Sequence, residues 1–339
     1  MRCRLYSLLL IAALAGCSNY PEDRAKVPLS ELRRTTVGRE AEAQADAAFT
    51  PLANGANLTG TFRERLHDPE HAITAEQAEA LKPYRILLVH GLLGEVGLKF
   101  TGFLDKFARG QGLIDYFKDQ KKTCVELNLD YSVAGFKSAS IDRSGTKIAD
   151  AIAASDRPVI VISHSKGGID TLDALRKLDA QGKLNKVAGW ISMQGVFYGS
   201  PDADDYINSR FKSVYATVAI KCLGGDFDAV KDLTCCTCQQ YETEHRADVE
   251  RIVKTVPIVC FASWSAEQPK HAQELSDGQV PTKSEILPGA DYVAASRISH
   301  SQTVIHASED FDRMAFTRTM LSLISDKMNS KFKMQNAKE

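Results

Sequence analysis

Residues 158–168, PVIVISHSKGG, constrain the fold more than any other stretch of this chain. A short apolar run ends abruptly at a serine among small residues and then opens into the helical pattern IDTLDALRKL, which predicts a strand, a sharp turn and a helix. Ser163 and Gly167 lie two residues either side of Ser165. Because both are small, the backbone can bend tightly there and lift the hydroxyl clear of the sheet, as in the pattern G-x-S-x-G. Ser165 is therefore a candidate nucleophile, with Ser163 in the place of the first glycine.

Short runs rich in Val and Ile alternate with amphipathic patterns from about residue 62 onward. Strands separated by helices predict an α/β fold, with a mostly parallel, doubly wound sheet. The runs that predict strands are 85–90, 124–129, 158–163, 187–193, 256–263 and 290–295. The patterns that predict helices include 113–120, 140–155, 245–256 and 311–328. Residues 199–255 are too long for a connecting loop, so they predict a cysteine-bearing insertion, a lid or cap, over the carboxyl edge of the sheet, where ligands bind.

The amino terminus carries an export pattern. Arg2 and Arg4 precede the apolar run LYSLLLIAALA, which is short for a bilayer span and is followed at once by polar residues. The run ends in LAGC, which resembles the lipobox of bacterial lipoproteins and implies acylation of Cys17. An ordinary signal peptide cut near Gly16, or an uncleaved anchor, are the alternatives. We therefore expect a signal peptide at 1–16, a tether at 17–61 and the folded domain at 62–339.

This export pattern also determines how the cysteines and the cellular location of the protein are interpreted. A lipid anchor implies the bacterial cell envelope, and Ser18 resembles the residue that follows the cysteine in outer-membrane lipoproteins. An oxidising compartment favours disulfides over free thiols. We expect one or more disulfides, of undetermined pairing, among Cys124, Cys222, Cys235, Cys236, Cys238 and Cys260. A metal site at C-C-x-C and free thiols are the alternatives, although the metal site lacks paired C-x-x-C spacing. The formal net charge of −1 gives no electrostatic reason to expect a nucleic acid partner.

A nucleophilic serine needs a base, a group that orients the base, and donors for a developing oxyanion. Directly after RILLV comes HGLLG at 90–94, where a strand runs into a loop that contains glycine. The backbone amide of Leu92, with that of Lys166 after the serine, predicts an oxyanion hole. His90 is interpreted as a residue that orders this loop, and a plain turn with no chemistry is the alternative.

Several segments in order resemble the α/β-hydrolase fold and, within it, bacterial triacylglycerol lipases and related esterases. The segments are HGLLG, DRSGTKIADAI, SHSKGG and ISMQGVFYGSPDADD, and the resemblance covers roughly residues 84–325. The family order is serine, acid, histidine. It implies that Asp277, in SDGQVP, is the acid and that His300, in ISHSQTV, is the base. His306 is the rival base, and Asp226 and Asp291 are the rival acids.

The same turn also contains S-x-x-K, which in penicillin-binding enzymes would make Ser163 the nucleophile and Lys166 its base. Neither companion motif, S-D-N or K-T-G, occurs in this chain, which disfavours that interpretation. We instead expect Lys166 to contribute its amide and to extend its side chain over the site. His164 is expected to pack without taking part in the chemistry.

The resemblance implies hydrolysis of carboxylic esters, with acyl lipids as the leading substrate class and no cofactor. Asp202, Asp204 and Asp205 could ligate calcium, but surface carboxylates are the simpler interpretation, so we expect no metal. The alternative from another class is a non-catalytic lipoprotein that uses the fold to bind a partner or a hydrophobic ligand. The oligomeric state is left open.

Overall fold

The computed structural model describes residue 49 and residues 55–68, 72–92, 116–135, 137–208, 226–265, 275–305 and 311–336. The predicted signal peptide, Cys17, most of the tether, Cys222 and His306 lie outside these ranges. The export, lipidation and domain-boundary interpretations therefore stay predictions. Within the described part of the chain, no helix has the length and apolar character needed to cross a membrane.

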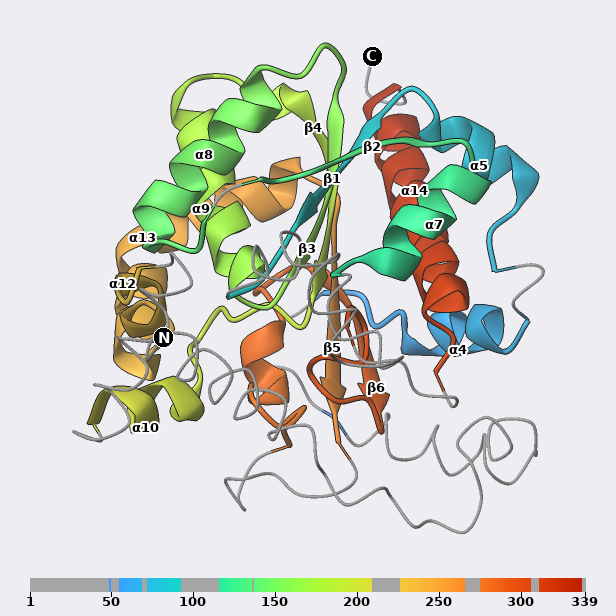
Figure 1. Ribbon diagram of the computed structural model, residues 1–339. Coiled ribbons are helices and arrows are strands. Elements are labelled where there is room, and N and C mark those ends of the chain that lie inside the picture. The colour runs from blue at the N-terminus through green and yellow to red at the C-terminus, as the bar shows by residue number, and fades with distance from the viewer. Residues whose placement is uncertain are drawn as a thin grey trace, which may run out of the picture.

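The core of the molecule is a six-stranded parallel sheet with the strand order β2-β1-β3-β4-β5-β6. Its strands are β1 (Arg85–Val89), β2 (Asp130–Val133), β3 (Val159–His164), β4 (Val187–Met193), β5 (Ile258–Trp264) and β6 (Asp291–Ser296). All carboxyl ends therefore meet at one edge, toward which the arrows of β5 and β6 point in Figure 1. The predicted parallel sheet is confirmed.

Helices cover both faces of this sheet (Figure 1). One face carries α8 (Ile141–Ala153), α9 (Lys166–Ala180) and α13 (Cys235–Thr255). The other carries α4 (Thr59–His67), α5 (Ala75–Leu81), α7 (Lys118–Glu126) and α14 (Arg313–Asn336). Shorter elements are η1 (Leu184–Lys186), α10 (Pro201–Asn208), α12 (Asp228–Lys231) and η2 (Thr282–Glu285).

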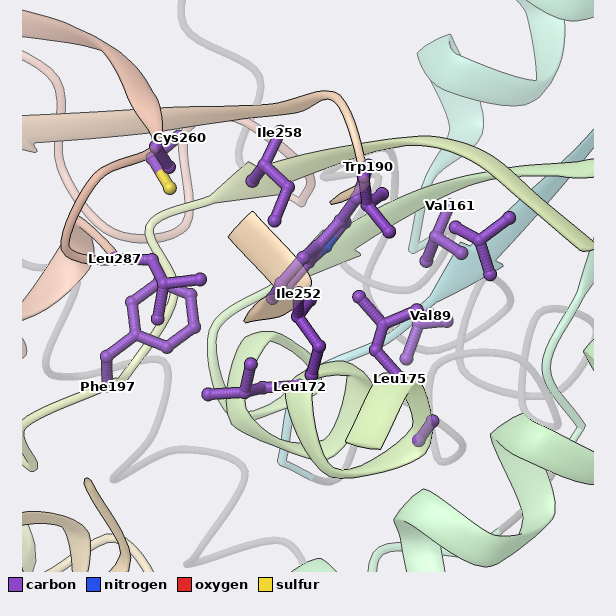
Figure 2. Close-up of a cluster of buried hydrophobic side chains, with 14 of the residues drawn as sticks. Val89, Val161, Leu172, Leu175, Trp190, Phe197, Ile252, Ile258, Cys260 and Leu287 are labelled. Carbon is purple, nitrogen blue, oxygen red and sulfur yellow. The ribbon is translucent and has the colours of Figure 1, made fainter. Parts of the chain in front are cut away.

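Successive apolar side chains of a strand point to opposite faces of the sheet, so both faces have to be covered by helices. In β1, Leu87 and Val89 join the hydrophobic cluster under α8, α9 and α13, whereas Ile86 and Leu88 join the cluster under α14. This is the period of two expected for a strand that is buried on both sides. Figure 2 shows the first cluster, where Trp190 of the sheet meets Leu172 and Ile252 from the covering helices.

The predicted strand at 124–129 is wrong. Residues up to Glu126 complete helix α7, and the strand is β2, which begins at Asp130. Gln120, Thr123 and Cys124 are the buried residues of α7, and their i, i+3, i+4 spacing is helical although the sequence CVELNL also alternates. A short apolar run does not distinguish the two periods by itself.

The cysteine-bearing segment ends as a crossover helix between β4 and β5. Helix α13 begins at Cys235, and its residues Val249 and Ile252 are buried in the cluster that covers the sheet. This part of 199–255 is therefore cover for the sheet and not a lid. A lid or cap stays a prediction for the part of the segment that precedes α13.

Most of the cysteines in the described part of the chain are single thiols. Cys124, Cys236, Cys238 and Cys260 are free, so the disulfide prediction is wrong for these four. The reason is their separation, because Cys124, Cys238 and Cys260 are buried in three different hydrophobic clusters. The described residues also hold no metal-ligating group of cysteines.

Candidate active site

Ser165 lies on a sharp turn between β3 and α9, as the sequence predicts. Its backbone has φ 57° and ψ −129°, a conformation that a non-glycine residue adopts at a cost of about 1–3 kcal/mol. Gly167 allows α9 to start close to β1, since a Cβ there would lie 2.7 Å from the carbonyl oxygen of Val89. Ser163 is buried within β3, and its hydroxyl accepts a hydrogen bond from the indole N–H of Trp190 at 2.8 Å. The Ser163 hydroxyl therefore has a structural partner in the core, and Ser165 is the serine at the turn.

The structure brings Ser165, His300 and Asp277 together from three distant segments. Nε2 of His300 lies 2.8 Å from Oγ of Ser165, and Nδ1 lies 2.5 Å from Oδ2 of Asp277. An ionised carboxylate can only accept, so Nδ1 carries the proton and Nε2 is free to accept the hydrogen of the serine hydroxyl. In this arrangement His300 can take a proton from Ser165, and the imidazolium that forms lies beside a carboxylate that stabilises it.

Asp277 is held as a carboxylate by several donors. Its Oδ1 accepts the backbone N–H groups of Gln279 at 2.9 Å and Val280 at 2.8 Å. Burial by itself would raise the pKa of Asp277, but the charge and hydrogen bond of His300 and the Val280 amide outweigh burial and lower its pKa below the usual 3.8. The backbone N–H of His300 also donates to the carbonyl oxygen of Asp277 at 3.0 Å, so the two loops are joined twice.

The loop after β1 passes directly beside Ser165. A Cβ on Gly91 would lie 2.7 Å from Cβ of Ser165, so only glycine fits there. Nδ1 of buried His90 lies 2.8 Å from the carbonyl oxygen of Gly91, a contact that holds the peptide in place. Leu92 follows Gly91 in this loop. Lys166 is the first residue of α9, so the backbone N–H of Lys166 has no partner within the helix. The two predicted oxyanion donors thus lie on the two backbone segments that border the serine.

The expectation that the Lys166 side chain extends over the site is wrong. The side chain is 1% exposed, and its Nζ pairs with Oδ1 of Asp170 at 2.5 Å, one turn along α9. An ammonium group loses its hydration on burial and needs a carboxylate close by, which the i, i+4 spacing supplies. Lys166 is therefore an internal ion-pair partner and is not the base of an S-x-x-K site.

Comparison with known proteins rests on structure alone, because no family model and no curated protein matches the sequence. A carboxyl esterase of metagenomic origin superposes with a TM-score of 0.53 at 17% identity, covering 74% of this chain and 76% of that one. The chain has the α/β-hydrolase fold. A mature lipase from Bacillus licheniformis, BlEst2, matches with a TM-score of 0.47 at 19% identity, covering 72% of this chain and 89% of that one.

A buried polar chain that the sequence did not reveal links two loops of this site. The N–H of Gly91 donates to the hydroxyl of Tyr116 at 2.9 Å, and that hydroxyl lies 2.6 Å from Nδ1 of His164. Nε2 of His164 then lies 2.8 Å from the carbonyl oxygen of His300. The pattern is satisfied when Tyr116 donates to Nδ1 and Nε2–H donates to His300. Burial and the neighbouring His300 lower the pKa of His164 to about 3, so the ring is neutral.

Gln194, which directly follows β4, holds the loop that carries His300 through hydrogen bonds. Its Nε2 donates to the hydroxyl of Ser263 at 2.7 Å and to the carbonyl oxygen of Ser299 at 3.0 Å. Its Oε1 accepts the hydroxyl of Thr303 at 2.7 Å. Gln194 occurs in the motif ISMQG, but its partners lie 69, 105 and 109 residues further along the chain, so its role has no local signal.

The rival acids have other partners in the structure. Asp291 forms an ion pair with Lys327, and Asp226 pairs with Arg143. Asp204 accepts the N–H of Cys235 at 3.1 Å, and it forms no metal-ligating group with other described residues. The rival base His306 lies outside the described residues.

Proposed function

We propose that this protein is a serine hydrolase that cleaves carboxylic esters, with Ser165 as nucleophile, His300 as base and Asp277 as the residue that orients it. The observation that carries the proposal is the continuous hydrogen-bonded path from Ser165 Oγ through the His300 ring to Asp277. The path lies at the carboxyl edge of a parallel sheet, where ligands of open α/β sheets bind. The neighbouring fold of a carboxyl esterase supports the same reaction class.

The mechanism follows from the contacts. His300 Nε2 takes the hydroxyl proton as Ser165 attacks the ester carbonyl carbon, and Asp277 stabilises the imidazolium that results. The amides of Leu92 and Lys166 would stabilise the tetrahedral oxyanion. The imidazolium then protonates the leaving alcohol, and a water activated by the same imidazole cleaves the acyl-enzyme. Every proton passes through His300, and no cofactor takes part.

Acyl lipids are the proposed substrate class. The support is the apolar character of the loop beside the serine, where half-buried Leu92 packs against buried clusters that include Ile141, Val196, Ile207, Phe227 and Val230. We also propose that acylated Cys17 tethers the domain to the outer membrane, which would keep it close to lipid. Detergent-phase partitioning of the expressed protein, lost on Cys17→Ala, tests the anchor separately from catalysis.

Labelling with a fluorophosphonate probe tests the proposed reaction. We expect stoichiometric modification of Ser165 in the folded protein and none in Ser165→Ala, with Ser163→Ala as the matched control that keeps full labelling. Absence of labelling in the folded wild type would contradict the enzyme proposal and favour a non-catalytic binding protein. Turnover of p-nitrophenyl esters with longer acyl chains supports a lipid substrate, whereas activity confined to acetate and butyrate contradicts it.

A further inference from the structure

Glu285, at the end of η2, is a fully buried carboxyl group without a cationic partner. Its exposed fraction is 0%, and its Oε2 accepts the backbone N–H of Ser263 at 2.6 Å. No lysine or arginine of the described chain pairs with it, and its Oε1 meets no hydrogen-bond donor there. A buried carboxylate in this state would be costly, so the group either attracts a proton or a cation.

The nearest acidic neighbour is Asp277. One ligand atom from each of Asp277, Glu285 and His300 lies within 4.8 Å of the other two, so the two carboxyl groups are close neighbours. Two buried carboxyl groups this close cannot both ionise readily, and the one that keeps its proton can donate it toward the other.

The donors decide which group holds that proton. Asp277 accepts His300 Nδ1–H and the N–H groups of Gln279 and Val280, whereas Glu285 accepts Ser263 N–H only. Each donor stabilises the charged form, so the charge belongs on Asp277 and the proton on Glu285. The pKa values agree in direction, because burial and the Asp277 charge raise the pKa of Glu285 well above its usual 4.5.

We propose that Glu285 is a positioning residue which, in its protonated form, donates a hydrogen bond to Asp277 and so holds that carboxylate against His300. The effect on turnover rests on the proposed function, whereas the location of the proton does not. Loss of the proton at alkaline pH would place a second negative charge beside Asp277. The other titratable groups that face Glu285 are His300 and Cys260, and burial raises the pKa of the Cys260 thiol to about 12.

Two substitutions separate a neutral donor from a charged carboxylate. Glu285→Gln keeps a donor toward Asp277 and an acceptor for Ser263, so we expect kcat at neutral pH within about threefold of wild type. Glu285→Leu removes both, and we expect kcat to fall by about 10- to 100-fold with little change in KM, since one hydrogen bond to a charged group is lost. We also expect the wild type to lose activity at alkaline pH as Glu285 ionises, and Glu285→Gln to keep it.

The proposal is overturned if folded Glu285→Gln is as impaired as Glu285→Leu, as a bound cation that needs an ionised Glu285 would require. It is equally overturned if both variants match the wild type, or if Glu285→Gln keeps the wild-type alkaline limb. Infrared spectroscopy keeps the test independent of folding of the leucine variant and of catalysis. The wild type and Ser165→Ala should show a protonated-carboxyl C=O band at neutral pH that Glu285→Gln lacks. Its absence from the wild type overturns the proposal even if the protein hydrolyses no ester.

Discussion

Two buried acidic clusters border Ser165, and they deal with burial in different ways. In the first, Asp170 pairs with the Lys166 ammonium within one helix. In the second, Asp277 accepts a histidine and two backbone amides, with Glu285 beside it. Burial raises the pKa of Asp170 to about 7 although Lys166 lowers it, whereas the donors around Asp277 lower its pKa despite equal burial. The charge of a buried carboxyl group therefore depends on its donors more than on its depth.

The largest expected effect is a loss of kcat on substitution of Asp277 in the second cluster. Asp277→Asn leaves the shape intact but removes the acceptor that fixes the His300 tautomer, so we expect kcat to fall by about 10⁴-fold. Steady-state hydrolysis of a p-nitrophenyl ester measures it. The matched control is Asp291→Asn, whose carboxylate pairs with Lys327 and which should stay within about twofold of wild type. The opposite ranking would make Asp291 the acid.

The next effect is on stability and tests the first cluster. Asp170→Leu leaves the Lys166 ammonium buried without an acceptor, which we expect to lower the free energy of unfolding by about 3–5 kcal/mol. The double variant Lys166→Met, Asp170→Leu should recover most of this loss, because two apolar groups of similar volume replace the pair. Urea denaturation measures both. Equal stability of the single variant and the wild type would contradict the buried ion pair.

The pH dependence of stability should differ in sign between Asp170 and Asp277. The contribution of Asp170 is fully present below its usual pKa of 3.8 and is lost as pH rises through about 7. The contribution of Asp277 is present above 3.8 and is lost as pH falls through its lower folded pKa. Denaturation at a series of pH values should show that Asp170→Asn removes the loss toward neutral pH and Asp277→Asn the loss toward acid. The same slopes in both variants would contradict the comparison.

A smaller effect is expected at His164, a neutral group next to the serine. His164→Phe interrupts the path from the Gly91 loop to the His300 carbonyl, and we expect kcat to fall by about tenfold with KM unchanged. Tyr116→Phe breaks the same path, so the double variant should lose less than the product of the two single losses. Independent losses would show that the two residues do not act through one chain.

The smallest effect is expected at Ser163, away from both clusters. Ser163→Gly restores the G-x-S-x-G motif at the turn but leaves the buried indole N–H of Trp190 without its acceptor. We expect a loss of about 1–2 kcal/mol in unfolding free energy and unchanged kcat. A large fall in kcat would mean that Ser163 takes part in the chemistry.

Much of the fold follows from local patterns. The runs at 85–90, 158–163 and 187–193 are strands because nearly continuous apolar residues suit a sheet buried on both sides. The same reasoning failed at 124–129, where a short run fits both periods and the packing of Cys124 inside α7 decided for helix. The disulfide expectation failed at Cys124 and Cys260 for a similar reason, since chemical context cannot say which thiols meet.

The sequence by itself determined the turn at Ser165, because a strand, a small-residue bend and a helix are written within a few neighbouring residues. With the order of the family motifs it also singled out Asp277 and His300. Only the tertiary structure decided that Lys166 turns inward to Asp170, that His164 and Gln194 anchor the histidine loop, and that Glu285 lies against Asp277. These contacts join side chains from separate elements or depend on which face of α9 is buried. They are therefore fixed by packing and by the donors available at each buried group, and no local pattern encodes either.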